Sequence, residues 1–285
     1  MKLVKQGLRA VQRLFWLSHK GLVKQNSRFH NKHAGETCII AGNGASLRSH
    51  DLEKLDQIPI IGCSYTLIDK RMADLNVKYV FSTDPYLFYP ILYNTYPFIR
   101  KFQKNLIRGM FEKSIKGNQR VEFFLNLTNF YAPICRQKNV NLIYHFGNKN
   151  GEELDMAGNF DGMDGALDIM IAGAKYMGFS KAILVGCDYL GNPPLLGHFY
   201  GDQEPYFDEH MPDYCDRVEA VSKGIDLLVV LPEGTKSDNF EHTTFEALYA
   251  SEPKLNTNSD IVSEQHLSTL RTAAASWQAV MSAEQ

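Results

Sequence analysis

The sequence contains a glycine-rich turn that would bring the main chain close to a ligand. Residues 42–47 read Gly-Asn-Gly-Ala-Ser-Leu and directly follow the apolar run Thr37–Ala41. Glycines permit a sharp turn, and the N–H groups at the start of a following helix attract anions. The turn lacks the Gly-Lys-Ser/Thr ending of a P-loop, and Leu47 replaces the third glycine of a dinucleotide fingerprint. A tight structural turn is the alternative to a phosphate site, whose candidate residues are Gly42, Asn43, Gly44 and Ser46.

A second group of polar residues follows another apolar run. Ala182–Gly186 leads into Cys187, Asp188 and Tyr189. Ligands of open α/β sheets bind outside the carboxyl ends of the strands, so Asp188 and Tyr189 are candidate nucleotide-binding residues. A carboxylate that only fixes the next loop is an equally weighted alternative for Asp188.

Two further regions contain candidate site residues. Asp164 and Gly165 open the apolar, alanine-containing stretch Gly165–Met177, where capping of a helix is the better single explanation for Asp164. The loop 191–211 combines histidines and tyrosines with acidic residues, which predicts an active-site lid. Histidine is the usual general base near neutral pH, so this loop supplies the catalytic candidates His198, Tyr200 and His210.

The order of the apolar runs predicts the elements that position these residues. Strand-like runs alternate with helical patterns, the clearest of which are Gly165–Met177 and Asp213–Lys223. Such alternation predicts an α/β fold, with a Rossmann-like parallel sheet and helices on both faces. The predicted strands are Thr37–Ala41, Ile58–Gly62, Lys78–Ser82, Val121–Leu125, Val140–Tyr144, Ala182–Gly186 and Asp226–Leu231.

The two ends of the chain differ from this central domain. Eight Lys and Arg residues precede the first acid, Glu36, and the rest of the chain therefore carries −2 − 8 = −10. Val4, Leu8, Val11 and Phe15 share one helical face, which predicts a basic amphipathic helix. We expect a basic extension at residues 1–35, a nucleotide-binding domain at 36–250, and a linker with a C-terminal helix at 251–285. A helix or lid is expected at Tyr86–Phe98.

Composition and charge limit the partners and the compartment. A basic amphipathic helix would suit peripheral contact of residues 1–32 with an anionic membrane, and packing on the chain's own domain is the alternative. We find no apolar run long enough to span a bilayer, no secretory signal and no nucleic-acid motif. Five widely spaced cysteines without a C-x-x-C pair indicate free thiols. We expect a cytoplasmic protein, with homo-oligomerisation left open.

The glycine turn resembles the GNGPSL turn of bacterial family 42 sialyltransferases, with Ala45 in place of proline. The similarity continues through Cys63-Ser64, Asp84-Pro85 and Gly186-Cys187-Asp188, and covers roughly Thr37 to Pro232. These features are shared with a wider superfamily that includes motility-associated flagellin glycosyltransferases and 6-hydroxymethylpterin pyrophosphokinase-like proteins. The resemblance implies a Rossmann-like, metal-independent transferase that uses a nonulosonic acid activated by cytidine monophosphate (CMP), without a cofactor.

The resemblance also implies roles for individual residues. The glycine turn would bind the nucleotide phosphate, Tyr200 would steady the leaving phosphate, and His210 would be the base that activates the acceptor hydroxyl. The family's tyrosine partner position corresponds to Leu190. A glycan or glycolipid acceptor at the inner face of the membrane would fit the basic extension. Nucleotide-facing family positions correspond to Ser64, Asp84 and Asp164.

Those last three residues depart from the family pattern. Asp84 and Asp164 would place carboxylates near a phosphate, where like charges repel unless a cation such as Mg²⁺ lies between them. An Mg²⁺-dependent phosphotransferase of the pterin pyrophosphokinase type, with Asp84, Asp164 and Asp188 near the metal, is therefore a second hypothesis. A non-catalytic nucleotide-sugar-binding domain is a third.

Overall fold

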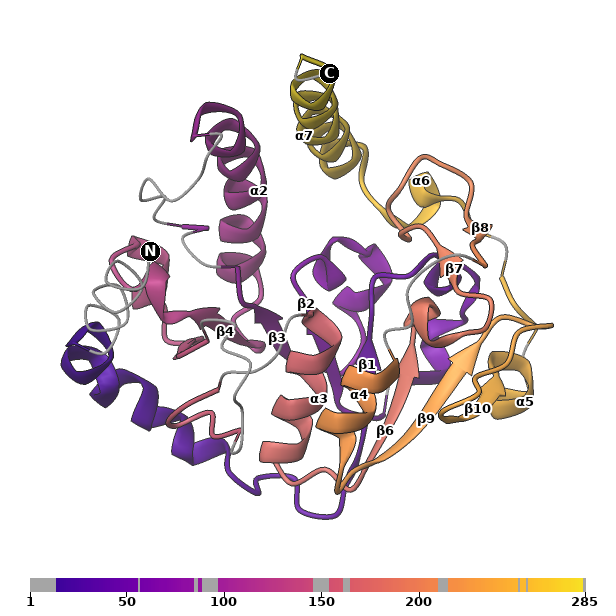
Figure 1. Ribbon diagram of the computed structural model, residues 1–285, viewed down its shortest axis with the longest axis horizontal. Coiled ribbons are helices and arrows are strands. Elements are labelled where there is room, and N and C mark those ends of the chain that lie inside the picture. Colours follow the sequence, from indigo (N-terminus) through magenta and orange to yellow (C-terminus); the bar gives the residue numbers. More distant parts are fainter. Residues whose placement is uncertain are drawn as a thin grey trace.

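The structure, a computed structural model, describes residues 14–55, 57–84, 87–88, 97–145, 154–160, 165–209, 215–250, 252–254 and 256–283. Its centre is an eight-stranded, fully parallel sheet with the strand order β10-β9-β6-β1-β2-β3-β4-β5 (Figure 1). This arrangement confirms the predicted α/β, Rossmann-like fold. The strands are β1 (Thr37–Ala41), β2 (Ile60–Cys63), β3 (Val77–Ser82), β4 (Glu122–Asn126), β5 (Val140–Ile143), β6 (Lys181–Val185), β9 (Asp226–Leu231) and β10 (Glu241–Thr244).

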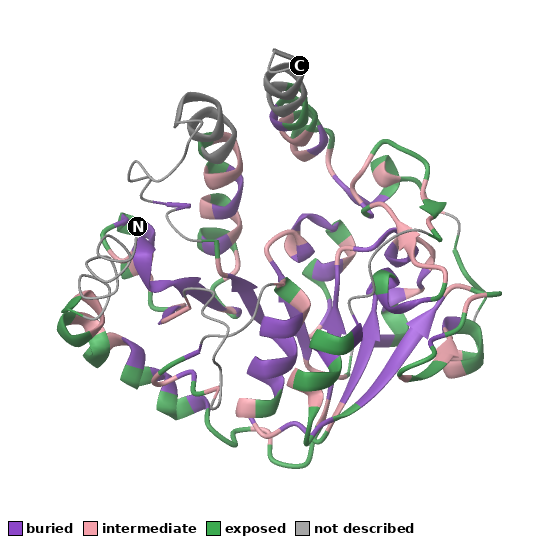
Figure 2. Cartoon of the chain, in the orientation of Figure 1, coloured by how far each residue is buried: buried purple, intermediate pink, exposed green. Residues whose placement is uncertain are grey.

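The central strands are apolar along their whole length because both faces of the sheet are covered. In β1, Cys38 and Ile40 belong to one buried cluster, whereas Ile39 and Ala41 belong to the other. Side chains alternate between the faces of a strand, so a strand buried on both sides is an unbroken apolar run. Figure 2 shows the resulting buried character of the strands.

One face of the sheet is covered by α3 (Ala166–Tyr176) and α4 (Cys215–Ser222), which pack on each other. The contact of α3 with the sheet is close, because a Cβ built on Gly173 would lie 2.3 Å from Cζ of Phe81. Helix α3 is buried along most of its length, as its continuous apolar sequence predicts (Figure 2).

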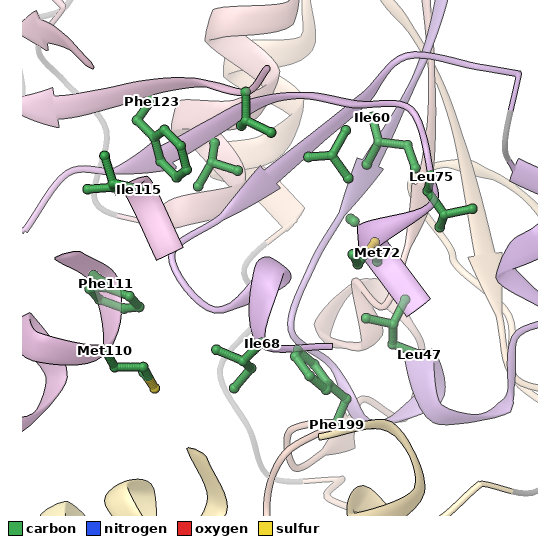
Figure 3. Close-up of a cluster of buried hydrophobic side chains, with 14 of the residues drawn as sticks. Leu47, Ile60, Ile68, Met72, Leu75, Met110, Phe111, Ile115, Phe123 and Phe199 are labelled. Atoms are coloured by element: carbon green, nitrogen blue, oxygen red, sulfur yellow. The ribbon is translucent and has the colours of Figure 1, made fainter. Parts of the chain in front are cut away.

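The other face is covered by α2 (Pro97–Gly117) and by short 3-10 helices. Met110, Phe111 and Ile115 of α2 join a cluster with strand residues such as Ile60 and Phe123 (Figure 3). The 3-10 helix η2 (Ala45–Ser49) adds Leu47 to the same cluster. Leu47 is therefore a core residue, which explains why the third position of the dinucleotide pattern is not glycine here.

The described part of the basic extension packs on the domain. Residues 14–24 are helical and lead into the 3-10 helix η1 (Gln25–Phe29). Phe29 is buried against the sheet, and the side chain of Asn26 donates hydrogen bonds to the carbonyls of Leu142 and Met156, both at 2.8 Å. The described residues thus favour packing on the chain's own domain, and they include no helix with the length and apolar character that crossing a bilayer requires.

The C-terminal part is more structured than its composition predicts. The expected linker contains α6 (Asn258–Ile261), which begins at a capping box between Thr257 and Asp260. We call residues 252–254 and 256–261 the C-terminal strap. The predicted terminal helix is α7 (Glu264–Ala283), which packs on α2.

Several elements were not predicted from the sequence. These are the long helix α2, the edge strand β10, the short helix α5 (Phe245–Tyr249) and the two-stranded antiparallel pair β7 (Leu195–Leu196) and β8 (Tyr206–Phe207). Most of the expected helix or lid at Tyr86–Phe98 lies outside the described residues. All five cysteines are free, and four of them are buried.

Two helical glycines should respond oppositely to alanine. Gly173→Ala should lower the free energy of unfolding by about 1–3 kcal/mol, because its methyl group would overlap Phe81. Gly109→Ala in α2 is the matched control: nothing lies within 4 Å of its Cβ position, so helix propensity alone should stabilise the protein by up to about 1 kcal/mol. Urea denaturation measures both effects. Equal stabilisation of both variants would contradict the close packing of α3 on β3.

Candidate functional site

The candidate site lies where the chain reverses its direction across the sheet. From β1 the chain proceeds through β2 to β5 at one edge and then returns to β6, which pairs with β1 on its other side. The carboxyl ends of β1 and β6 therefore flank a topological switch point, the usual ligand position in open α/β sheets. The glycine turn follows β1, and Gly186 and Asp188 follow β6.

The turns after β1 and β6 are in direct backbone contact. The N–H groups of Gly42 and Gly44 donate to the carbonyls of Val185 and Gly186, both at 2.8 Å. A Cβ on Gly42 would lie 2.3 Å from the Gly186 oxygen, and one on Gly44 would lie 2.5 Å from a carboxylate oxygen of Asp188. These glycines are therefore required by the protein's own packing.

Three N–H groups of the turn are engaged within the protein. Besides Gly42 and Gly44, the N–H of Ser46 is also bonded, to Asp188 Oδ2 at 2.8 Å. The element that follows is a five-residue 3-10 helix in place of an α-helix. A ligand phosphate at the switch point would use donors other than these three.

A cavity of about 570 Å³ opens beside the turn, within the size range of small-molecule sites. Its walls come from the glycine turn, the start of α3, the segment after β6, the loop that contains His198, and α4. The lining residues are Gly42, Asn43, Gly44, Cys63, Gly165, Ala166, Leu167, Asp168, Met170, Gly186, Cys187, Tyr189, Leu190, His198, Arg217 and Val218. The structure thus brings together five of the predicted nucleotide-binding residues, Gly42, Asn43, Gly44, Gly165 and Tyr189, with the catalytic candidate His198.

Asn43 lines the cavity and carries a buried hydrogen-bond acceptor. Its side-chain oxygen is buried and has no partner among the described residues. Its main-chain carbonyl accepts a hydrogen bond from the N–H of Phe199 at 3.0 Å, which holds the turn against the loop. A buried acceptor without a donor is costly, so this oxygen is suited to an N–H or O–H group of a ligand.

Two helices bring charged groups of both signs to the cavity, including the buried carboxylate of Asp168 in the first turn of α3. The N-terminus of α3 faces the cavity through Gly165, Ala166 and Leu167, and its N-cap residue, Gly165, has no side chain to occupy the first N–H groups. Arg217 of α4 adds a guanidinium to the wall. Sequence reasoning predicted both helices, but nothing in the pattern of α4 indicated that Arg217 faces this cavity.

The position of the N-cap corrects the assignment of Asp164. The helix begins at Ala166 with Gly165 as N-cap, one residue after the predicted capping position. Asp164 lies outside the described residues, and so does His210.

His198 and Tyr200 belong to an aromatic stack beside the cavity. Their ring centroids are 5.1 Å apart, and Tyr200 also contacts the ring of Tyr65 at 4.8 Å. His198 is open to the cavity, yet the surrounding protein desolvates it and lowers its pKa. Its imidazole is therefore neutral at neutral pH and able to accept a proton. Burial raises the pKa of Tyr200, so its phenol remains protonated and can donate.

The other predicted nucleotide-binding residues do not line this cavity. The hydroxyl of Ser64 donates to that of Ser82 at 3.0 Å. Asp84 is exposed, and its main-chain carbonyl accepts a hydrogen bond from Asn129 at 3.1 Å. Ser46 donates to Asp188 through both its N–H and its hydroxyl.

Asp188 is buried and fastens the loop after β6 to the turn after β1. Both of its carboxylate oxygens accept hydrogen bonds from Ser46, and burial raises its pKa to about 6. This geometry corresponds to the loop-fixing alternative for Asp188. The described residues contain no group of three His, Cys, Asp or Glu side chains placed to hold a metal ion.

The fold and this cavity define an α/β protein with a candidate small-molecule site at the switch point of a parallel sheet. No protein-family model and no curated protein sequence matches the chain. Among solved structures, it is similar to the sialyltransferase CstII from Campylobacter jejuni in complex with a substrate analogue, cytidine-5'-monophosphate. That match has 18% identity and a TM-score of 0.41, and it covers 79% of this chain and 88% of the other.

A second structure, sialyltransferase CST-II in complex with trisaccharide acceptor and CMP, is similar at 19% identity with a TM-score of 0.39. The match covers 78% of this chain and 93% of that one. Similarity at this distance does not indicate what this protein binds.

Arg48 should determine the environment of His198. Its guanidinium donates to the carbonyls of Phe199 at 2.9 Å, His198 at 3.1 Å and Gly201. Arg48→Ala should loosen this loop, rehydrate the imidazole and raise the pKa of His198 toward its ordinary value. Arg48→Lys should have a smaller effect than Arg48→Ala, because an ammonium keeps hydrogen-bond donors and the positive charge even though it lacks the planar fork.

Titration of the histidine ring signals by NMR measures this shift. Arg108→Ala, whose guanidinium pairs with Glu112 within α2, is the control and should leave the His198 titration unchanged. An unchanged His198 pKa in the Arg48→Ala protein would show that the loop holds its position without this residue.

Asp188 should make the protein less stable as the pH rises. Its folded-state pKa of about 6 exceeds the ordinary 3.8, so its stabilising contribution is complete below pH 3.8 and is lost as the pH rises through about 6. The loss amounts to at most roughly 3 kcal/mol. Relative to Asp188→Asn, the wild type should therefore lose unfolding free energy between about pH 4 and pH 7. Urea denaturation across this range tests the difference, and Asp226→Asn, at the exposed start of β9, should behave like wild type.

A stability difference between wild type and Asp188→Asn that did not change with pH would mean that the buried carboxylate keeps an ordinary pKa.

Proposed function

We propose that the protein is a sialyltransferase-like glycosyltransferase, which transfers a nonulosonic acid from a CMP-activated donor to a hydroxyl group of a surface glycan. The observation that carries the proposal is the unpartnered side-chain oxygen of Asn43, in a Gly-Asn-Gly turn that lines a nucleotide-sized cavity at the switch point. The resemblance of residues 42–47 to the sialyltransferase turn supports the donor class.

The cavity offers complementary groups to the parts of CMP. The side-chain oxygen of Asn43 suits a donor such as the amino group of cytosine or a ribose hydroxyl. The phosphate is better placed near Arg217, because the N–H groups of Gly42, Gly44 and Ser46 are bonded within the protein and the carboxylate of Asp168 lies in the first turn of α3.

The reaction would be a direct displacement. A histidine removes the proton from the acceptor hydroxyl, that oxygen forms a bond to the anomeric carbon of the donor sugar, and the bond from this carbon to the phosphate oxygen breaks. CMP leaves with the bonding electron pair, and Arg217 and Tyr200 stabilise the charge on its phosphate. This displacement reaction does not require a metal ion.

Two histidines are candidates for the base. His198 lines the cavity and has a lowered pKa, which keeps the imidazole neutral and available as a proton acceptor. His210 is the base that the family resemblance implies, and it lies outside the described residues. We propose that one of these two loop histidines is the base, and replacement of each in turn distinguishes them.

The arrangement of carboxylates gives less support to the metal-dependent phosphotransferase. Both oxygens of Asp188 are bonded to Ser46, and Asp84 is exposed outside the cavity lining. Two of the three carboxylates in that hypothesis are therefore not assembled at the cavity, while Asp164 lies outside the described residues.

Calorimetric titration with CMP and with ATP, each with Mg²⁺ and with a chelator, tests the donor class. We expect CMP to bind equally well with and without metal. Asn43→Ala should weaken CMP binding by about tenfold, the loss of one good hydrogen bond. Asn239→Ala, in an exposed loop, should have no effect. If ATP bound but CMP did not, and only in the presence of Mg²⁺, the phosphotransferase hypothesis would replace the transferase hypothesis.

Transfer from a CMP-activated nonulosonic acid to glycan acceptors tests the chemistry. Replacement of the true base, by His198→Gln or His210→Gln, should reduce turnover by roughly 10²–10⁴-fold with CMP affinity unchanged. Full turnover in both variants would remove the histidines from the mechanism. CMP binding without transfer to any acceptor would favour a nucleotide-sugar-binding domain.

A further inference from the structure

A second cavity, of about 440 Å³, is lined in part by η2, and we call the cavity beside the glycine turn the donor cavity. It is bounded by η2 and His50, the carboxyl ends of β9 and β10, the β7–β8 region and the C-terminal strap. The two cavities share no lining residue. The second cavity therefore also occupies the ligand-binding edge of the sheet, but over different strands.

A buried histidine with no hydrogen-bond partner belongs to this second cavity. His50 is 3% exposed, and neither ring nitrogen has a partner among the described residues. Its ring stacks on Phe245 with the centroids 4.6 Å apart, and both residues line the cavity. Buried polar groups are normally satisfied, so an imidazole with two unpartnered nitrogens in the wall of a cavity indicates a missing partner.

The state of the imidazole restricts what this partner can be. Burial, with the nearby positive charge of Arg71, lowers the pKa of His50 to about 3, so the ring is neutral. A neutral imidazole has one N–H donor and one acceptor nitrogen. A hydroxyl group both donates and accepts, and a pair of hydroxyls would satisfy both nitrogens. A cation could satisfy only the acceptor nitrogen.

The walls and the rim restrict the ligand further. Glu204, Glu233 and Glu246 are exposed residues at the cavity, and the guanidinium of Arg48 is engaged by loop carbonyls. Three carboxylates repel an anion but accept hydrogen bonds from hydroxyl groups. Apolar side chains such as Leu195, Leu231 and Pro232 provide contacts for C–H groups.

We propose that the second cavity is a binding site for a neutral sugar residue, with His50 as its central hydrogen-bonding group. Hydroxyl groups satisfy the imidazole and the carboxylates, and the apolar walls contact the carbon skeleton of the ring. The site is separate from the donor cavity, and its existence does not depend on the proposed transfer reaction.

NMR of the full-length protein with ¹⁵N-labelled histidine tests this site. The probes are the methyl glycosides of galactose and glucose, and N-acetylglucosamine. At least one should shift the His50 ring signals saturably at millimolar concentration, and the signals are identified by their loss in His50→Phe. Saturating CMP should leave this sugar affinity unchanged.

Two variants test whether the sugar binds in the second cavity. His50→Phe keeps a ring that can stack on Phe245 but removes both nitrogens, and it should reduce the sugar affinity at least about tenfold. Leu195→Trp enlarges another lining side chain, reduces the space in the cavity and should cause a similar loss with His50 intact. Asn43→Ala, which alters only the donor cavity, is the control and should retain sugar binding.

Three results would overturn the proposal. One is the absence of a saturable shift with all three sugars. Another is undiminished sugar affinity in both His50→Phe and Leu195→Trp. The third is a His50 shift with spermidine but with no sugar, which would identify a site for cations.

Discussion

The close contact between the turns after β1 and β6 is the constraint on which the site depends. Gly42 and Gly186 meet backbone to backbone, and no side chain larger than hydrogen fits at Gly42 or Gly44. The carboxylate of Asp188 crosses this contact to hold Ser46. Two neighbouring strands of a sheet are thereby extended into one rigid platform beyond their carboxyl ends.

This platform determines how ligands can approach. The N–H groups of Gly42, Gly44 and Ser46 are used in joining β1 to β6, so the positive charge in the wall of the first cavity comes from Arg217. The side chain of Asn43 is the part of the turn that still presents an unpartnered atom to a ligand. The same platform separates the two cavities, since Gly44 lines one and Ala45 lines the other.

Much of the fold could be predicted from the sequence because it rests on local patterns. The predicted strands agree with the observed ones to within two residues at each end, since strands buried on both faces appear as unbroken apolar runs. Edge strand β10, with its exposed Glu241 and His242, has no such run. The short β7–β8 pair is stabilised by pairing between segments and not by its own composition.

The site was less predictable, because its contacts join residues that are far apart in sequence. The glycine turn was recognised, yet its role in joining two strands depends on Asp188, 142 residues after Ser46. Arg217 and His50 carry no sequence signal of their own, since only the packing of α4 and of η2 directs them to cavities. Tyr189 and His198 were found because they follow a strand that reaches the switch point.

Arg48 also connects two parts of the chain that are far apart in sequence. Its guanidinium holds the carbonyls of the His198 loop, while its own carbonyl accepts a hydrogen bond from Asn256 of the C-terminal strap at 2.7 Å. Asn258 of the strap also donates directly to the carbonyl of Gly201 in the loop at 3.0 Å. Opening the loop would therefore disturb the strap, so the two segments form one cooperative unit of local unfolding. By thermodynamic linkage, a ligand that stabilises the loop would also reduce local unfolding of the C-terminal strap.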